Sequence, residues 1–170
     1  AQLRDTMVMQ RRADATLGFL TTTALNMVGG GIPLSDIGWL QYNRWGVELY
    51  SSGLVCRKDY AERNPEVLQG FIAATIRGLR GMLADPAAAM ASLKRREPLI
   101  DERLEISRNE LINEVALLTP HVRANGVSSV DRARFERSAA QVAEAFDIPV
   151  RPPMDFTYTD RFLPADRRIV

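Results

Sequence analysis

Three consecutive threonines, Thr21, Thr22 and Thr23, are the first residues in the chain whose type and position could do chemistry. The apolar residues before them predict a short strand, and the uncharged residues after them predict a helix. Hydroxyls and free helix N–H groups at the carboxyl edge of a sheet suit a carboxylate, a sulfonate or a polar heterocycle. Threonine hydroxyls are also typical of ordinary helix caps, so ligand contact and capping both stay open.

A second group combines aromatic rings with a few polar side chains. Trp45, Glu48 and Tyr50 are followed directly by Ser51 and Ser52. Aromatic faces with a few placed polar groups are the usual lining of a small-molecule cleft. Two core aromatics and a solvated glutamate are the alternative interpretation. Glu48 favours a cationic or hydrogen-bond-donating solute, whereas the threonines favour an acceptor-rich one, and the sequence does not rank the two.

The sequence predicts no catalytic set and no metal centre. The single cysteine, Cys56, ends an apolar run without a histidine nearby, which indicates a buried and inert thiol. The single histidine, His121, follows Thr119-Pro120 in a predicted turn, which indicates a surface residue. One cysteine and one histidine exclude an internal disulfide and a multi-cysteine or multi-histidine metal site within this chain. We therefore predict no catalytic residue, no metal and no cofactor.

Composition places the chain among ordinary globular proteins. Of 170 residues, 46% are hydrophobic and 25% charged, which excludes disordered and collagen-like classes. The formal net charge is +1, so no strong field would hold nucleic acid or an anionic membrane. The uncharged stretch 15–35 contains threonines, three consecutive glycines and Pro33, and it is too polar and too broken for a membrane-spanning helix.

A strand-rich start is expected to position these residues. The apolar runs predict short strands at 13–19, 37–42 and 47–57, after a helix end at 1–10. A further helix is expected to begin with a hydroxyl cap at Thr21 or Thr22. It ends at three glycines, which suit a left-handed C-cap. Because a phosphate loop needs its glycines before a helix, these favour structural capping.

A helical remainder is expected after residue 59. Four helix starts are marked by Asn or Asp, in two cases followed by proline: Asn64-Pro65, Asp85-Pro86, Asp101 and Asp131. The second of these helices is expected to reach Arg96. Prolines from residue 149 onward predict an extended tail.

Several short stretches together resemble the SsuA/THI5-like (NMT1-type) substrate-binding proteins of ABC importers. In the first part of the chain they are residues 13–19 (ADATLGF), 45–50 (WGVELY), 53–55 (GLV) and 64–67 (NPEV). They continue with Gly78-Leu79, residues 85–89 (DPAAA), Thr119-Pro120, Asn125-Gly126 and Phe162-Leu163-Pro164. Their order and spacing carry the resemblance, because none is specific alone.

The resemblance implies an α/β fold of the two-lobed, periplasmic-binding-protein-like type II, here partial, with few short strands followed by a helix-rich C-terminal part. Residues 1–46 would belong to the second, or lid, lobe. Residues 47–57 would form a hinge crossover strand. Residues 58–170 would form the helical remainder of the first lobe with an extended tail. The chain would correspond to about the second half of a family member.

The resemblance also implies a function and a site. The expected ligand-binding residues are Phe19, Thr21, Thr22, Thr23, Trp45, Glu48, Tyr50 and Ser51. The expected function is to capture a small polar or aromatic solute in an interlobe cleft and deliver it to ABC permease subunits, with no nucleic-acid partner. The expected location is the periplasm, or a lipid-anchored position outside the cytoplasmic membrane.

Two other functions stay open. A THI5-type pyrimidine-precursor enzyme would need a cofactor lysine with clustered cysteine and histidine, and the two lysines, Lys58 and Lys94, lie in no such cluster. An effector-sensing domain of a transcription regulator would need a DNA-binding helix pair, which the sequence does not show. Because Ala1 is not Met and the resemblance starts part-way, we expect a processed or truncated chain. We expect it to pair with itself or with a missing N-terminal half.

Overall fold

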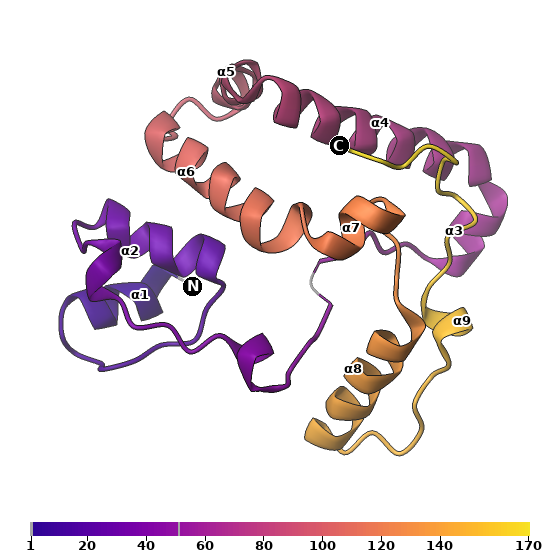
Figure 1. The fold of residues 1–170 in the computed structure, drawn as a ribbon, viewed down its shortest axis with the longest axis horizontal. Helices are drawn as coiled ribbons and strands as arrows, with labels where there is room; N and C mark the ends of the chain where they lie inside the picture. The colour runs from indigo at the N-terminus through magenta and orange to yellow at the C-terminus, as the bar shows by residue number, and fades with distance from the viewer. Residues whose placement is uncertain (1, 51) are drawn as a thin grey trace. The chain divides into compact units, whose positions relative to one another are not determined.

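The computed structural model describes residues 2–50 and 52–170 and shows helices joined by irregular segments (Figure 1). Neither range contains a strand, so the predicted α/β, type II periplasmic-binding-protein-like fold is wrong. Where they are described, the runs 13–19, 37–42 and 47–57 are irregular or turn-like. Their residue types favour a pleated surface only where a neighbouring strand supplies backbone hydrogen bonds, and within the described ranges none does.

The first of two compact units combines Ala1–Trp39 with Gly81–Thr119. Its elements are α1 (Gln2–Met9), the π-helical turn η1 (Leu20–Ala24), α2 (Leu25–Gly29), η2 (Leu34–Asp36), α5 (Pro86–Arg96), α6 (Glu102–Ile112) and η4 (Asn113–Leu117). Helix α2 packs against α1 and α6, and α5 packs against α6. The expected helix end at 1–10 is confirmed by α1. After α2, Gly31 takes a φ of 92°, the left-handed conformation expected of this glycine turn.

The second unit combines Leu40–Arg80 with Pro120–Val170. Its elements are η3 (Tyr42–Trp45), α3 (Lys58–Arg63), α4 (Pro65–Ala84, whose end belongs to the first unit), α7 (Pro120–Asn125), α8 (Arg132–Ala145) and α9 (Met154–Thr157). Ala61, Leu68 and Phe162 form an apolar cluster against which Ile72 packs. This cluster joins α3, α4 and the C-terminal tail.

The C-terminal tail is also held by one arginine of α4. Arg80 donates hydrogen bonds to the carbonyl oxygens of Arg168, at 2.7 Å, and Asp166, at 3.2 Å. The tail therefore lies beside α4, as its yellow ribbon shows (Figure 1). The expected extended tail is interrupted by α9, because Pro153 is followed by four residues that complete one helical turn.

The predicted helix starts after residue 59 are confirmed. Asp85 accepts a hydrogen bond from the N–H of Ala88, and Asp101 accepts from that of Leu104. Helix α4 begins at Pro65, and α5 ends at Arg96 as expected. In the described ranges, no helix is both long and apolar enough to cross a membrane. The division into 1–46, 47–57 and 58–170 stays a prediction.

Candidate functional site

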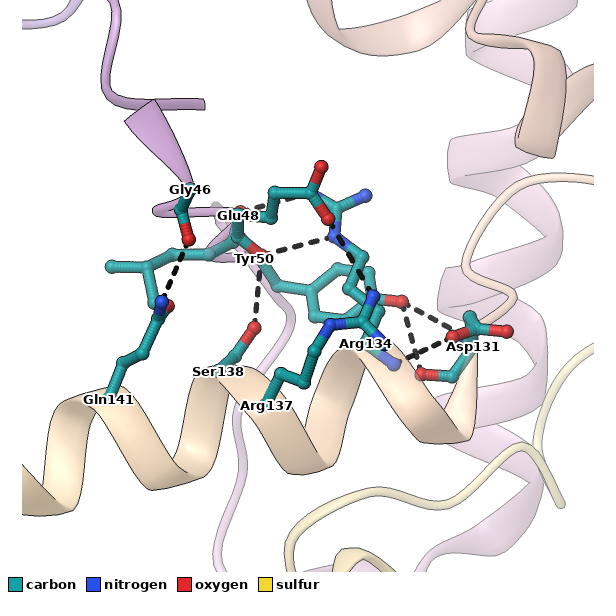
Figure 2. A network of polar contacts seen from close by, with 9 residues as sticks. Gly46, Glu48, Tyr50, Asp131, Arg134, Arg137, Ser138 and Gln141 are labelled. Carbon is teal, nitrogen blue, oxygen red and sulfur yellow. Dashed lines mark hydrogen bonds and ion pairs between the residues drawn. The ribbon is translucent and has the colours of Figure 1, made fainter. Parts of the chain in front are cut away.

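An extended segment, residues 46–50, lies along one face of α8 (Figure 2). The carbonyl oxygen of Gly46 accepts from the amide of Gln141 at 2.8 Å. The carbonyl oxygen of Glu48 accepts from the Ser138 hydroxyl at 2.9 Å and from Nε of Arg134 at 3.1 Å. Side chains of the helix thus satisfy backbone groups that a second strand would satisfy in a sheet.

Tyr50 joins the far end of this segment to the start of α8. Its hydroxyl oxygen accepts from the backbone N–H of Asp131 at 2.9 Å, and Figure 2 shows the two residues facing each other. The guanidinium of Arg134 lies 4.5 Å from the centroid of the Tyr50 ring, which is cation–π geometry. Arg134 also donates to the carbonyl oxygen of Leu49 at 3.1 Å. One arginine therefore holds two carbonyls and one ring.

Glu48 is engaged more loosely than Tyr50. Its carboxylate lies 3.7 Å from a terminal nitrogen of Arg137, and both side chains are more than half exposed. An exposed ion pair of this kind contributes less than about 1 kcal/mol. The carboxylate of Glu48 is therefore easily turned toward another cation or hydrogen-bond donor.

Alternate residues of the segment face a hollow of about 400 Å³. Val47 and Leu49 line it from the segment, while Gln141, Val142, Glu144, Ala145 and Phe146 line it from α8 and the residue after it. The side chain of Phe146 is 74% exposed, so an aromatic face is open to solvent there. The lining is mostly apolar with one carboxylate, which suits a ring that carries a hydrogen-bond donor.

The three threonines lie inside η1 in the first unit and not at its cap. The N-cap is Phe19, and its carbonyl oxygen accepts from the N–H groups of Thr22 and Thr23, at 3.0 and 2.8 Å. The expected hydroxyl cap at Thr21 or Thr22 is therefore wrong. Thr23 is 6% exposed, and Arg108 donates to the carbonyl oxygen of Thr21 at 2.6 Å.

The predicted ligand-binding residues fall into both units. Phe19, which is 72% exposed, and the threonines belong to the first unit. Trp45, which is 76% exposed, belongs to the second with Glu48 and Tyr50, and the structure brings the last two together on α8. Ser51 lies outside the described residues. Ligand contact by all eight residues stays a prediction.

The structure corrects the predicted burial of Cys56 and shows the surroundings of His121. Cys56 is exposed, so its predicted burial is wrong; the neighbouring apolar residues Leu54 and Val55 are exposed as well. His121 is half-buried, with one ring nitrogen 3.0 Å from the Ser129 hydroxyl and the other 3.4 Å from the Asn125 amide. Across residues 2–50 and 52–170, no group of three or more His, Cys, Asp or Glu residues could hold a metal ion.

Sequence reasoning missed the polar face of α8. Asp131, Arg134, Ser138 and Gln141 follow one another at spacings of three and four, so they share one face of the helix. The spacing is present in the sequence, but of these four residues only Asp131 was interpreted, as a helix start. The polar face predicts contact with carbonyl acceptors, and the segment 46–50 provides them.

The Asp131 cap gives a first testable prediction. Its carboxylate accepts from the N–H of Arg134 at 2.7 Å, so we expect Asp131→Ala to lower the free energy of unfolding by about 1 kcal/mol. Asp131→Asn keeps a capping oxygen and serves as the control. Urea unfolding followed by circular dichroism measures both variants. Equal stability of Asp131→Ala and the wild type would show that this cap is not formed.

Comparison with known proteins identifies a family for the N-terminal half of the chain. No curated protein and no solved structure matches the chain. A family model described as NMT1/THI5 like matches residues 2–89, which contain η1 and the segment 46–50, whereas α8 lies outside the match. The resemblance found from the residues is thereby confirmed. Because the match covers more than half of the 170 residues, the chain belongs to the NMT1/THI5-like family.

Proposed function

We propose that the chain is the solute-binding component of an ABC importer, which captures a small solute and hands it to a membrane permease. Two facts support the proposal. The family includes ABC substrate-binding proteins alongside THI5 enzymes. The single observation that carries it is the hollow between the held segment 46–50 and α8, which is open, mostly apolar and within the size range of ligand pockets.

The lining of the hollow favours an uncharged heteroaromatic solute with an N–H donor. Phe146 and Val142 offer apolar contact to a ring, and Glu144 offers a carboxylate to the donor. Glu48 stands between the lining residues Val47 and Leu49 in the sequence, but its carboxylate pairs with Arg137 and does not line the hollow. Anions such as sulfonates and nitrate would meet the negative charge of Glu144, so we place them below neutral pyrimidines in affinity.

A thermal-shift series tests this ranking. The probes are 4-aminopyrimidine, benzoate, benzenesulfonate and nitrate, which separate the ring from the charge. A ligand at 100 times its Kd that binds only the folded state adds about 2.7 kcal/mol, so we expect a rise in melting temperature of several degrees for 4-aminopyrimidine. The anions should give a smaller rise or none. A flat response to all four probes, or a rise with nitrate alone, would contradict the proposal.

The THI5 enzymes of the same family define the alternative function. A binding protein releases its ligand unchanged, whereas an enzyme alters it. We therefore expect mass spectrometry to recover 4-aminopyrimidine intact after long incubation with the chain. Accumulation of a modified pyrimidine in proportion to protein and time would favour the enzyme. The proposed importer role includes a location outside the cytoplasmic membrane, beside the permease.

A further inference from the structure

A second hollow lies on the second unit, where α3 and the start of α4 meet the C-terminal tail. It has a volume of about 290 Å³ and is lined by Ala61, Glu62, Pro65, Gln69, Arg161 and Phe162. Ala61 and Phe162 are each 7% exposed and belong to the apolar cluster with Leu68. Packing therefore fixes the apolar side of this hollow.

Two opposite charges line this hollow without forming an ion pair with each other. The guanidinium of Arg161 lies 4.4 Å from the centroid of the Phe162 ring, and among the described residues no carboxylate pairs with it. The carboxylate of Glu62 lies 3.9 Å from the Lys58 ammonium, and its side chain is 54% exposed. Both groups therefore keep hydrogen-bonding capacity for a ligand in the hollow.

We propose that this hollow binds a small zwitterion, namely an α-amino acid with a branched aliphatic side chain. The ligand carboxylate accepts hydrogen bonds from the planar edge of Arg161, which suits a carboxylate geometrically. The ligand ammonium donates to Glu62. The aliphatic side chain contacts Ala61 and Pro65, and the Gln69 amide supplies one further polar contact. The volume is at the low end for ligand pockets, which fits a molecule of the size of leucine.

The opposite charges of Arg161 and Glu62 favour a zwitterion over ligands that carry a single kind of charge. A simple carboxylate would pair with Arg161 but would leave its charge facing Glu62. A simple amine would pair with Glu62 but would leave the guanidinium without an anion. Phosphate and other dianions would be repelled more strongly by Glu62. Only a ligand with both charges satisfies both side chains.

The test uses three probes that share one branched aliphatic body: L-leucine, 4-methylpentanoate and isopentylamine. Titrations of the full chain are followed by ¹H–¹⁵N NMR. Because each exposed charge pair is worth up to about fivefold in affinity, we expect leucine to bind about fivefold tighter than either single-charge probe. The largest shifts are expected at residues 61–69 and 161–162.

Two substitutions separate the contributions of the two charges. In Arg161→Gln, leucine should bind no better than isopentylamine. In Glu62→Gln, leucine should bind no better than 4-methylpentanoate. Arg151→Gln removes a positive charge from an exposed position that lines neither hollow, so it should leave leucine affinity unchanged.

Three results would overturn the proposal: absence of a saturable shift with leucine, equal binding of the three probes, or unchanged leucine affinity in Arg161→Gln. The two hollows share no lining residue, so this inference does not rest on the proposed solute site. A flat thermal-shift series with a positive leucine titration contradicts only the importer proposal. A positive thermal shift with 4-aminopyrimidine and no saturable response to leucine contradicts only the zwitterion site.

Discussion

Phe162→Ala is expected to lower the free energy of unfolding of the second unit by about 3 kcal/mol. Phe162 is 7% exposed and packs with Ala61 and Leu68. Its truncation therefore leaves a cavity at the place where α3, α4 and the tail meet. The guanidinium of Arg161, 4.4 Å from the ring centroid, also loses its aromatic partner. The cluster is small, so few other contacts compensate.

Urea unfolding measures this loss, and the chain supplies a matched control. Phe156 is 77% exposed, so Phe156→Ala should change the free energy of unfolding by less than about 0.5 kcal/mol. Phe162→Leu should fall between the two, because it keeps part of the buried volume. If Phe162→Ala and Phe156→Ala cost the same, the cluster around Phe162 does not stabilise the unit.

Arg134→Ala is expected to release the segment 46–50 from α8 and to weaken solute binding about tenfold. The change removes hydrogen bonds to the carbonyl oxygens of Glu48 and Leu49 and the contact with the Tyr50 ring. Each bond is partly exposed, so the summed loss of stability is about 1–2 kcal/mol. Affinity falls because Val47 and Leu49 then no longer hold one wall of the hollow in place.

The neighbouring arginine provides the control for this prediction. Arg137 contacts Glu48 through a 3.7 Å ion pair between exposed side chains and binds no backbone carbonyl of the segment among the contacts described above. Arg137→Ala should therefore leave stability within about 0.5 kcal/mol and affinity within about twofold of the wild type. Arg134→Lys keeps the charge but not the planar edge, so it should behave like Arg134→Ala. Equal effects of Arg134→Ala and Arg137→Ala would contradict the role given to Arg134.

Helix starts could be predicted from the sequence because capping is a local event. The caps at Asp85, Asp101 and Asp131 each bond an N–H within three residues along the chain. Strands could not be predicted in the same way, because a strand is stabilised by a partner distant in sequence. The segment from Gly46 to Tyr50 has the composition of a strand, but α8 bonds its carbonyls instead.

Of the two walls of the candidate site, only the one formed by residues 45–50 could be predicted from the sequence. The aromatic and acidic residues of 45–50 drew attention because they are neighbours in sequence. The opposite wall of the hollow comes from α8, and the bond from Gln141 to Gly46 joins positions 95 residues apart. No local pattern predicts such a pairing. The match to the family model ends at residue 89, before α8 begins, so the family does not predict this pairing either.

The central claim is that a small solute occupies the hollow between residues 46–50 and α8, and intermolecular NMR contacts test it most directly. With 4-aminopyrimidine bound to methyl-labelled chain, we predict nuclear Overhauser contacts from the ring protons to the methyl groups of Val47, Leu49 and Val142. Contacts that map instead to methyl groups outside this hollow, or none at a ligand concentration that saturates the thermal shift, would contradict the claim.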